Sequence, residues 1–396
     1  MTLLQPTITR NAMINNFDID DFLQHHWQQK PLLIRNAFVN FSNPLTPEEL
    51  AGLACEEDVE SRIVAKKNGH YELAHGPFEE SVFTSLPDTD WTLLVQAVDH
   101  YDRDVADLLN QFRFIPNWRI DDVMVSYASK NGGIPAHTDN YDVFLLQGAG
   151  CRQWQLGSKT THVSQLQSNE ELQLLDDFEP EQEWLLNPGD MLYVPPGFGH
   201  RGTSMDNDCM TYSIGFRAPS HGELLSDFCD HQISLLNEQQ RYSDPQLKHQ
   251  QHPGQITPAT LDKVQDILKK LVDDKDAIAH WFGEFMTLSK YPREVSRLEL
   301  SDNDIRSMLN EHNVLYRDNS SRFAYTNTNK QTTLHINAQS YNASLELAAL
   351  LANNDQYSTA AIQALLADRE SFTLIQQLIQ QGELYFEEQH NDDVYG

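Results

Sequence analysis

The chain has 396 residues, of which 40% are hydrophobic and 10% aromatic, and its formal net charge is −30 at pH 7. This length and apolar content predict two or three domains with buried cores, which excludes global disorder. The acidic charge argues against a general nucleic-acid-binding surface, because phosphates would be repelled. It is compatible with a basic protein substrate, or simply with high solubility.

The cysteines and the N-terminus bear on the compartment. The four cysteines, at positions 55, 151, 209 and 229, form no C-x-x-C pair. The sequence therefore indicates neither a zinc knuckle nor a redox pair, and reduced thiols are expected. The N-terminus has no basic region followed by an apolar run, and no window reaches the roughly eighteen apolar residues of a membrane span. A soluble, cytoplasmic protein with no membrane partner is expected.

The first hundred or so residues are predicted to mix helices and strands. Residues 17–27 have apolar side chains at helical spacing, and residues 31–35 are expected to form a short strand. A helix is predicted to begin after Thr46, which is followed by Pro47 and, three residues on, by Glu49. Residues 91–112 are predicted to form one amphipathic helix.

From residue 120 the pattern changes to short β-rich runs separated by Gly, Pro and Asn. The runs are 123–127, 143–146, 153–156, 183–186, 191–194 and 210–216. Such a succession predicts antiparallel strands, and the closest fit is the double-stranded β-helix, the jelly-roll core of cupins. The predicted fold class is therefore α+β, with a domain at 1–218 whose β-helix core covers about 120–218.

Beyond residue 218 the strand pattern stops. Residues 224–236 and 261–286 are predicted helices, which could pack on the barrel or on a second copy of the chain. The remainder has a helix, strand and helix order that resembles a small winged-helix module, with elements at 302–310, 314–317, 322–325, 333–336, 343–351 and 372–380. Such modules often bind nucleic acid, but the segment has few Lys or Arg residues, so a protein-contact role is favoured.

The motif with the clearest chemistry is the pair His137 and Asp139, with His200 following later in the chain. Residues i and i+2 of an extended chain point to the same face, so His137 and Asp139 can share a metal. His200 is expected on a turn after the strand 191–194. Two histidines and one carboxylate favour Fe(II) oxygenase chemistry, because three metal positions stay open. Zinc or manganese cupins remain alternatives.

The H-x-D spacing alone is a weak signal, because it or the looser H-x-E recurs elsewhere. The other matches are His100–Asp102, His390–Asp392, His70–Glu72 and His221–Glu223. The first is expected inside the helix 91–112, where residues i and i+2 diverge by roughly 200°. The second lies in a polar tail without a scaffold, and the last two have no β-rich context and no distal partner. The barrel context and the distal His200 therefore carry the prediction.

A cosubstrate site is predicted from Arg152, which opens the strand that contains Trp154. Iron oxygenases of this kind use 2-oxoglutarate, whose far carboxylate needs a fork-shaped cation while its other end chelates the metal. Arg152 is the candidate cation, and Ser126 could add a hydroxyl donor. The alternative is a rim arginine stacked on Trp154. The predicted cofactors are thus Fe(II), 2-oxoglutarate and O2.

Several stretches taken together resemble the JmjC-type ribosomal oxygenases, in particular their bacterial arginine-hydroxylase branch. They are residues 122–126, 137–144, 147–154, 188–200 and 212–219, with further similarity at 242–245 and 280–285. The resemblance implies iron at His137, Asp139 and His200, and 2-oxoglutarate at Arg152 with Ser126. It also implies a JmjC domain (1–218), a helical dimerisation region (219–292) that makes a homodimer, and a winged-helix-like domain (293–396).

The reaction implied by the resemblance is hydroxylation of the β-carbon of an arginine in large-subunit ribosomal protein sixteen, a basic partner. Tyr141 and an acidic rim are expected to hold the substrate guanidinium. Two other functions remain open. N-methyl demethylation uses the same iron chemistry and differs only in product mass. A non-catalytic module could bind ribosomal protein or RNA, although the full ligand set and Arg152 argue against it and the acidic charge argues against RNA.

Overall fold

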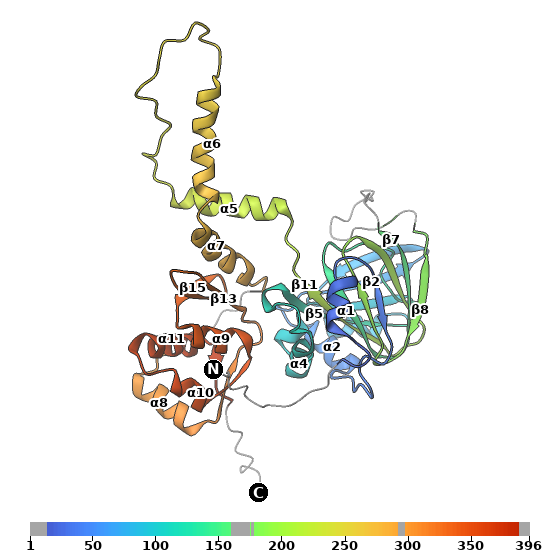
Figure 1. Ribbon diagram of the computed structural model, residues 1–396. Helices are drawn as coiled ribbons and strands as arrows, with labels where there is room; N and C mark the ends of the chain where they lie inside the picture. The colour runs from blue at the N-terminus through green and yellow to red at the C-terminus, as the bar shows by residue number, and fades with distance from the viewer. Residues whose placement is uncertain (1–13, 160–174, 176–177, 292–297, 388–396) are drawn as a thin grey trace. The chain divides into compact units, whose positions relative to one another are not determined.

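The computed structural model describes residues 14–159, 175, 178–291 and 298–387. The chain divides into two compact units, residues 1–218 and 219–396, and each is considered by itself (Figure 1). Within the described ranges, no helix is both long and apolar enough to cross a membrane. The predicted three-domain division, at 218 and 292, stays a prediction.

The first unit contains two antiparallel sheets and short helices that cover one of them. The larger sheet has the order β1-β9-β6-β11-β5-β4-β2-β3, and the smaller has the order β10-β7-β8. The strands are β1 (Leu32–Ile34), β2 (Ser61–Lys67), β3 (His70–His75), β4 (Trp91–Val95), β5 (Ile120–Ala128), β6 (Asp142–Ala149), β7 (Arg152–Lys159), β8 (Gln182–Leu186), β9 (Met191–Val194), β10 (Phe198–Ser204) and β11 (Cys209–Phe216). The helices are α1 (Ile19–His25), α2 (Pro47–Leu53), α3 (Glu80–Ser85) and α4 (Arg103–Leu109), with 3-10 turns η1 (Val98–His100), η2 (Asn110–Phe112) and η3 (Asn117–Arg119).

The alternation of side chains along β6 explains how the two sheets face each other. Phe144 and Leu146 belong to the large core that the helices of this unit share. Val143 and Leu145 point the other way, into a second core with Trp154 of the smaller sheet. Because successive residues of a strand point to opposite faces, the inner face of the large sheet carries Val143, Leu145 and then Gln147. The functional side chains described below lie on this inner layer.

The predicted helix at 91–112 is wrong. Residues Trp91–Val95 form strand β4, and α4 begins only after Asp102. Between them Ala97 has a left-handed backbone conformation (φ 49°), which a continuous right-handed helix does not allow. Asp102 caps α4 by accepting the backbone N–H of Val105 at 2.8 Å. A short apolar run such as Trp-Thr-Leu-Leu-Val has no periodicity that separates a buried strand from a helix, so tertiary pairing with β2 and β5 decided the outcome. The helix predicted after Thr46 is α2, with a complete capping box.

The second unit contains helices and two small sheets around one core. The helices are α5 (His221–Leu235), α6 (Pro258–Val272), α7 (Lys275–Thr287), α8 (Asp302–Glu311), α9 (Leu345–Asn353), α10 (Thr359–Ala364) and α11 (Arg369–Gln380). The sheets are β16-β12-β17 and β13-β14-β15, made of β12 (Val314–Arg317), β13 (Phe323–Asn327), β14 (Thr332–Ile336), β15 (Gln339–Asn342), β16 (Gln356–Ser358) and β17 (Leu384–Tyr385). The single helix predicted at 261–286 is wrong: α6 ends at Val272, and the Asp274 side chain caps α7.

Helix α7 packs on the sheet β13-β14-β15 at a buried histidine. His335 is fully buried, with Nδ1 2.9 Å from Ser340 Oγ and Nε2 3.0 Å from Thr326 Oγ1. Its ring lies against Gly283 of α7, where an added Cβ would come within 2.3 Å of the imidazole. Burial, and then the nearby His280, lower the pKa of His335 from 6.5 to about 4.

This burial predicts an acid-sensitive second unit. Between pH 6.5 and about 4 the unfolded chain binds a proton at His335 that the folded chain does not. The free energy of unfolding therefore decreases as the pH is lowered through that window, by a total on the order of 3 kcal/mol. The protein is equilibrated in urea at several pH values, and a hydrogen-exchange pulse at one fixed pH then reports the unfolded fraction of segment 323–342. These fractions give the slope of the free energy of unfolding against pH. A His335→Gln variant should show a flatter slope, and an equal slope would contradict the assignment.

Candidate metal centre

His137, Asp139 and His200 come together in the first unit. One nitrogen of each histidine and one carboxylate oxygen all lie within 4.8 Å of one another. His137 and His200 face each other across two backbone hydrogen bonds, of 3.0 and 2.9 Å, and their ring centroids are 4.2 Å apart. Their Nε2 atoms lie 3.9 and 3.4 Å from the Asp139 carboxylate. Such a cluster of donor atoms has the size of a single-ion site.

Local backbone contacts fix which nitrogen of each imidazole is available. Nδ1 of His137 lies 2.9 Å from the carbonyl oxygen of Pro135, and Nδ1 of His200 lies 3.0 Å from that of Phe198. A carbonyl can only accept, so each Nδ1 carries the proton and donates it. Each Nε2 is then left with its lone pair toward Asp139, which is the arrangement that metal-ligating histidines show in proteins.

The protonation state also suits a ligand. Burial, and then the nearby His137, lower the pKa of His200 to about 4. His200 is only 2% exposed and is therefore neutral near pH 7. Two imidazoles and one carboxylate cover one face of an ion and leave other positions open, which fits Fe(II) oxygenases better than closed structural zinc sites.

The structure corrects how His200 is presented. His200 was expected on a turn, but it is the third residue of β10, a strand that the sequence did not predict. The turn ends at Gly197, and a register irregularity between Phe198 and His200 follows it. Phe-Gly-His-Arg-Gly has too few β-formers to be recognised as a strand, and pairing with β7 supplies the extended conformation instead.

The competing H-x-D and H-x-E pairs join no such cluster: in the described part of the chain, the triad is the one group of this kind. His100 ends η1 and Asp102 caps α4, so the single helix invoked to exclude them does not exist. His70 and Glu72 lie on β3, contrary to the expected lack of β context, but both are exposed. His221 begins α5. His390 and Asp392 lie outside the described residues.

Arg152 is a buried cation in need of an anion. Its side chain is 4% exposed, and no carboxylate of a described residue pairs with it. Its Nε donates to Cys209 Sγ at 3.3 Å, whereas its Nη2 is buried without a hydrogen-bond partner. An unpaired buried charge is costly, so this pocket fits an anionic ligand such as the far carboxylate of 2-oxoglutarate.

Trp154 connects this cation to the metal ligands. The guanidinium of Arg152 lies 5.7 Å from the centre of the Trp154 ring, and the centre of the His200 ring lies 6.0 Å from that of Trp154. The stacking of Arg152 on Trp154 that was weighed as an alternative therefore exists, but in the buried interior rather than at a rim. Arg152, Trp154 and His200 thus line one side of a single site.

The opposite side is formed by β5. Asp122, Met124 and Ser126 alternate with the core residues Val123 and Val125, so they share the inner face of the strand. Ser126 is 3% exposed, and its neighbour across the ladder is Thr211 of β11. Ser126 therefore lies on the inner layer of the larger sheet, where a hydroxyl donor to a bound carboxylate was predicted.

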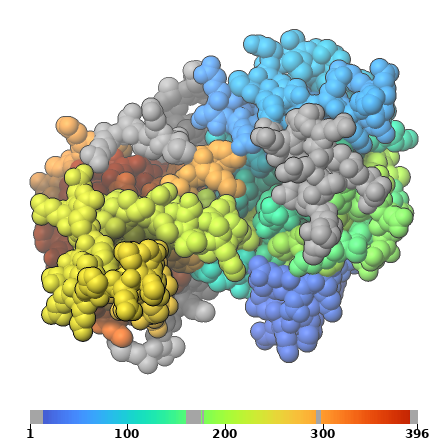
Figure 2. Space-filling view, turned by 90° about the horizontal axis from the view of Figure 1, so that it is seen from above, coloured from blue at the N-terminus to red at the C-terminus, as the bar shows by residue number. Residues whose placement is uncertain are grey.

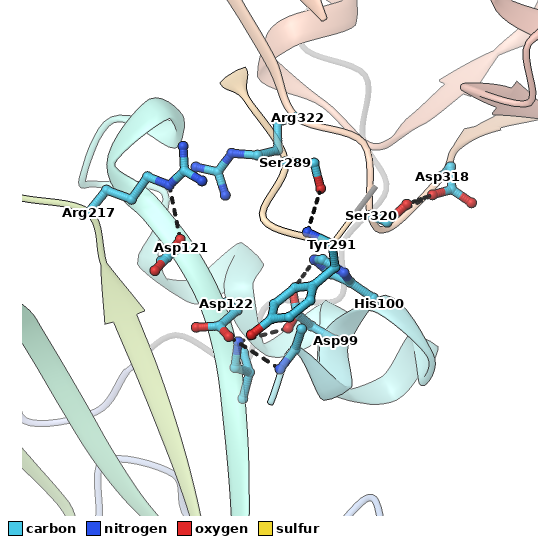
Figure 3. A network of polar contacts seen from close by, with 12 residues as sticks. Asp99, His100, Asp121, Asp122, Arg217, Ser289, Tyr291, Asp318, Ser320 and Arg322 are labelled. Atoms are coloured by element: carbon cyan, nitrogen blue, oxygen red, sulfur yellow. Dashed lines mark hydrogen bonds and ion pairs between the residues drawn. The ribbon is translucent and has the colours of Figure 1, made fainter. Parts of the chain in front are cut away.

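An acidic group surrounds Tyr141. Tyr141 is 44% exposed as a residue, but desolvation of its hydroxyl raises its pKa well above 10, and the charges of Asp139, Asp122 and Asp121 act in the same direction. Asp121 is already paired with Arg217 at 3.0 Å (Figure 3). Asp122 accepts the backbone N–H of Ala97 at 3.2 Å. Asp122 and Asp139 thus place negative charge beside a neutral phenol, which is a suitable environment for a guanidinium.

A double-stranded β-helix that holds a His-Asp-His site beside a buried arginine defines a metal-dependent oxygenase of the JmjC class. The JmjC domain family matches residues 107–224, and the ROXA-like winged helix matches residues 270–385. The chain is 40% identical over 299 residues to the ribosomal protein uL16 3-hydroxylase of Escherichia coli, covering 75% of this chain and 79% of that protein. It is 33% identical over 317 residues to a probable ribosomal oxygenase of Haemophilus influenzae, covering 77% and 78%.

Solved structures agree with this placement. The crystal structure of E. coli YcfD superposes with a TM-score of 0.87 at 34% identity, covering 94% of this chain and 99% of that one. YcfD, a ribosomal oxygenase, has also been solved in complex with cobalt and 2-oxoglutarate, and that structure matches with a TM-score of 0.85. The chain belongs to the JmjC ribosomal oxygenase family, and the predicted fold class and family resemblance are confirmed.

Proposed function

We propose that the protein is an Fe(II)- and 2-oxoglutarate-dependent oxygenase that hydroxylates the β-carbon of an arginine in ribosomal protein uL16. The observation that carries the proposal is the combination of the His137, Asp139 and His200 donor cluster with the unpaired buried Arg152. The relationship to the uL16 3-hydroxylase of E. coli supports the substrate. A substrate that is assembled into ribosomes implies a cytoplasmic enzyme.

The chain's own residues would act mainly by positioning. Iron(II) and 2-oxoglutarate, when bound with O2, supply an oxidative hydroxylation that releases succinate and CO2. His137, Asp139 and His200 would hold the metal, and the carbonyl-bound Nδ1 atoms keep both imidazoles in the ligating tautomer. Arg152 would fix the far carboxylate of 2-oxoglutarate, with the Ser126 hydroxyl as a second donor. Correct alignment of the reacting carbon is then the main contribution of the protein.

We further propose that Tyr141 and Asp122, beside the metal ligand Asp139, receive the substrate arginine. Asp122 lies on the same inner face of β5 as Ser126, four residues earlier in the strand. Its carboxylate lies beside Gly215, because a Cβ added to that glycine would be 3.5 Å from Asp122 Oδ1. A guanidinium held there would be near both the carboxylate and the Tyr141 ring. The net charge of −30 would favour the approach of a basic ribosomal protein.

The test uses anaerobically iron-loaded protein, 2-oxoglutarate, O2 and uL16 from the same organism. Mass spectrometry of uL16 should show the gain of one oxygen atom on an arginine, with matching succinate release. Loss of a methyl group from a methylated substrate would instead identify a demethylase. Succinate release without a modified product would keep the oxygenase and reject this substrate. No turnover with iron would favour a non-catalytic binding module.

We also propose that region 219–292 forms a homodimer and that 293–396 is the winged-helix domain. Helix α5 is held by Phe228, whose ring lies 5.0 Å from that of Trp281, but α6 has no buried residue (Figures 1 and 2). Its exposed apolar side chains recur at helical spacing, which is typical of a face that packs on another protein surface. They are Leu261, Val264, Ile267, Leu268 and Val272, each 41–58% exposed.

The dimer predicts a change in mass on substitution. Leu261→Glu with Leu268→Glu places two charges on one face of α6, so the variant should be monomeric at micromolar concentration. Light scattering after size-exclusion chromatography measures this. Val39→Glu, which lies outside region 219–292 and is 62% exposed, is the matched control and should remain dimeric. A monomeric unsubstituted protein would rule out the dimer.

A further inference from the structure

A chain of buried hydrogen bonds lies behind Arg152. The hydroxyl of Thr211 donates to Gln147 Oε1 at 3.1 Å, and Gln147 Nε2 donates to Cys209 Sγ at 3.5 Å. The same sulfur accepts the Nε–H of Arg152 at 3.3 Å. All four side chains are at most 4% exposed. The hydrogen bonds thus run from Thr211 of β11 to Gln147 of β6, back to Cys209 of β11 and on to Arg152 of β7, and so join the two sheets.

The position of each member is fixed by separate elements. Gln147 pairs with Thr211 in the ladder between β6 and β11, and its Nε2 also donates to the carbonyl of Ala149 at 2.7 Å. Cys209 begins β11, opposite Ala128 of β5. The sulfur is therefore held by the larger sheet, whereas the guanidinium that donates to it comes from the smaller sheet. Cys209 sets where the Nε edge of Arg152 lies.

Sulfur has a particular advantage at this position. An Nε–H inside a protein commonly pairs with a carboxylate, which would neutralise the guanidinium. A thiol sulfur is only a weak acceptor and brings no compensating carboxylate charge. The contact therefore orients the arginine while its positive charge stays uncompensated. The buried Nη2, which has no partner, is left for an anion.

We infer that Cys209, held by Gln147, is a positioning residue that presents the free edge of Arg152 to the far carboxylate of 2-oxoglutarate. This inference rests on the proposed function. Its specific consequence is that Cys209 acts through the distal carboxylate alone. Ligands that chelate the metal but lack this carboxylate should not depend on Cys209.

The experiment compares two ligands in anaerobic titrations of the iron-loaded protein, followed by the visible absorption that a 2-oxo acid gives on chelating Fe(II). The ligands are 2-oxoglutarate and 2-oxopentanoate, which has the same chain length without the far carboxylate. Cys209→Ala should weaken 2-oxoglutarate binding by about tenfold, because Arg152 loses the hydrogen bond that holds its guanidinium in the binding orientation. The Kd of 2-oxopentanoate and that of the metal should stay unchanged.

Matched variants separate this role from general damage. Cys151 is adjacent in sequence to Arg152, but its thiol donates to Asn187 Oδ1 at 3.3 Å. The Cys151→Ala variant should therefore bind 2-oxoglutarate as the unsubstituted protein does. Cys209→Ser keeps an acceptor and should recover most of the affinity. In turnover, Cys209→Ala should raise the KM for 2-oxoglutarate and leave kcat at saturation nearly unchanged.

The outcomes distinguish the inference from the function on which it rests. If the unsubstituted protein does not bind 2-oxoglutarate, the proposed function fails. If it binds 2-oxoglutarate and Cys209→Ala binds it equally well, only the inference fails. Equal weakening of both ligands would show a merely structural role for Cys209 and would also overturn the inference. Should Cys209→Ala not fold, Gln147→Met is titrated in its place, with the same selective loss expected.

Discussion

Asp139→Ala should abolish both metal binding and hydroxylation. The carboxylate is the anionic donor of the ligand cluster, and the two imidazoles are oriented toward it by Nδ1–H bonds to backbone carbonyls. Changes in residues that merely orient a ligand commonly reduce metal affinity by about 10–100-fold, so loss of a ligand itself should exceed about 100-fold. Isothermal titration with Mn(II) under anaerobic conditions measures the affinity, and mass spectrometry of uL16 measures the product.

The matched control for this variant is Glu72→Ala. Glu72 belongs to an H-x-E pair on β3, but it is exposed and pairs with Lys67 at 2.7 Å rather than with a cluster. Exposed pairs contribute about 0–1 kcal/mol, so this variant should bind metal and turn over normally. Metal affinity retained by Asp139→Ala would mean that the ion, if any, is bound elsewhere.

Arg152→Met should weaken 2-oxoglutarate binding by at least about 100-fold, because the fork-shaped donor provides more than one charge-assisted hydrogen bond. Metal affinity should be unchanged, since Arg152 contacts Trp154 and Cys209 but none of the three metal ligands. Arg152→Lys keeps the charge but loses the planar fork, so an intermediate loss is expected. Anaerobic titration with 2-oxoglutarate measures the Kd of the unsubstituted protein, of Arg152→Met and of Arg152→Lys.

Arg152→Met is expected to have the opposite effect on the stability of the ligand-free protein. In the ligand-free protein, Arg152 is a buried cation that no described carboxylate pairs, and replacing it with an apolar side chain of similar length removes a desolvation cost. The thermal midpoint of ligand-free Arg152→Met should therefore equal or exceed that of the unsubstituted protein. A large decrease would indicate that Arg152 is a structural residue, and would weaken its assignment to 2-oxoglutarate.

The sequence was sufficient for features that depend on local periodicity. The six β-rich runs all lie within strands, and Thr46 caps the helix that was expected after it. The pairing of His137 with Asp139 needed only the rule that alternate residues of an extended chain share a face. These inferences succeeded because the alternation of side chains along a strand, the contact that caps a helix and the geometry of an H-x-D pair are each set within a few residues.

Features that depend on contacts between distant segments could not be predicted. β4 was mistaken for a helix because its extended conformation depends on pairing with β2 and β5. β10 was missed because its glycines lower the strand propensity of the segment, which is held extended by pairing with β7. The contact between Cys209 and Arg152 depends on the facing of two sheets. A glutamine at the end of the apolar run 143–146 was the one available hint that polar contacts are buried there.

The tautomer of each histidine ligand is set by a carbonyl two residues earlier in the chain, Pro135 for His137 and Phe198 for His200. Main-chain oxygens are present whatever side chain the position carries. Ordinary point mutation therefore cannot delete either acceptor, unlike the aspartate or glutamate partner on which many histidine ligands rely. Side chains around this centre are free to diversify over evolutionary time toward new substrates, while the orientation of both imidazoles is inherited with the path of the backbone.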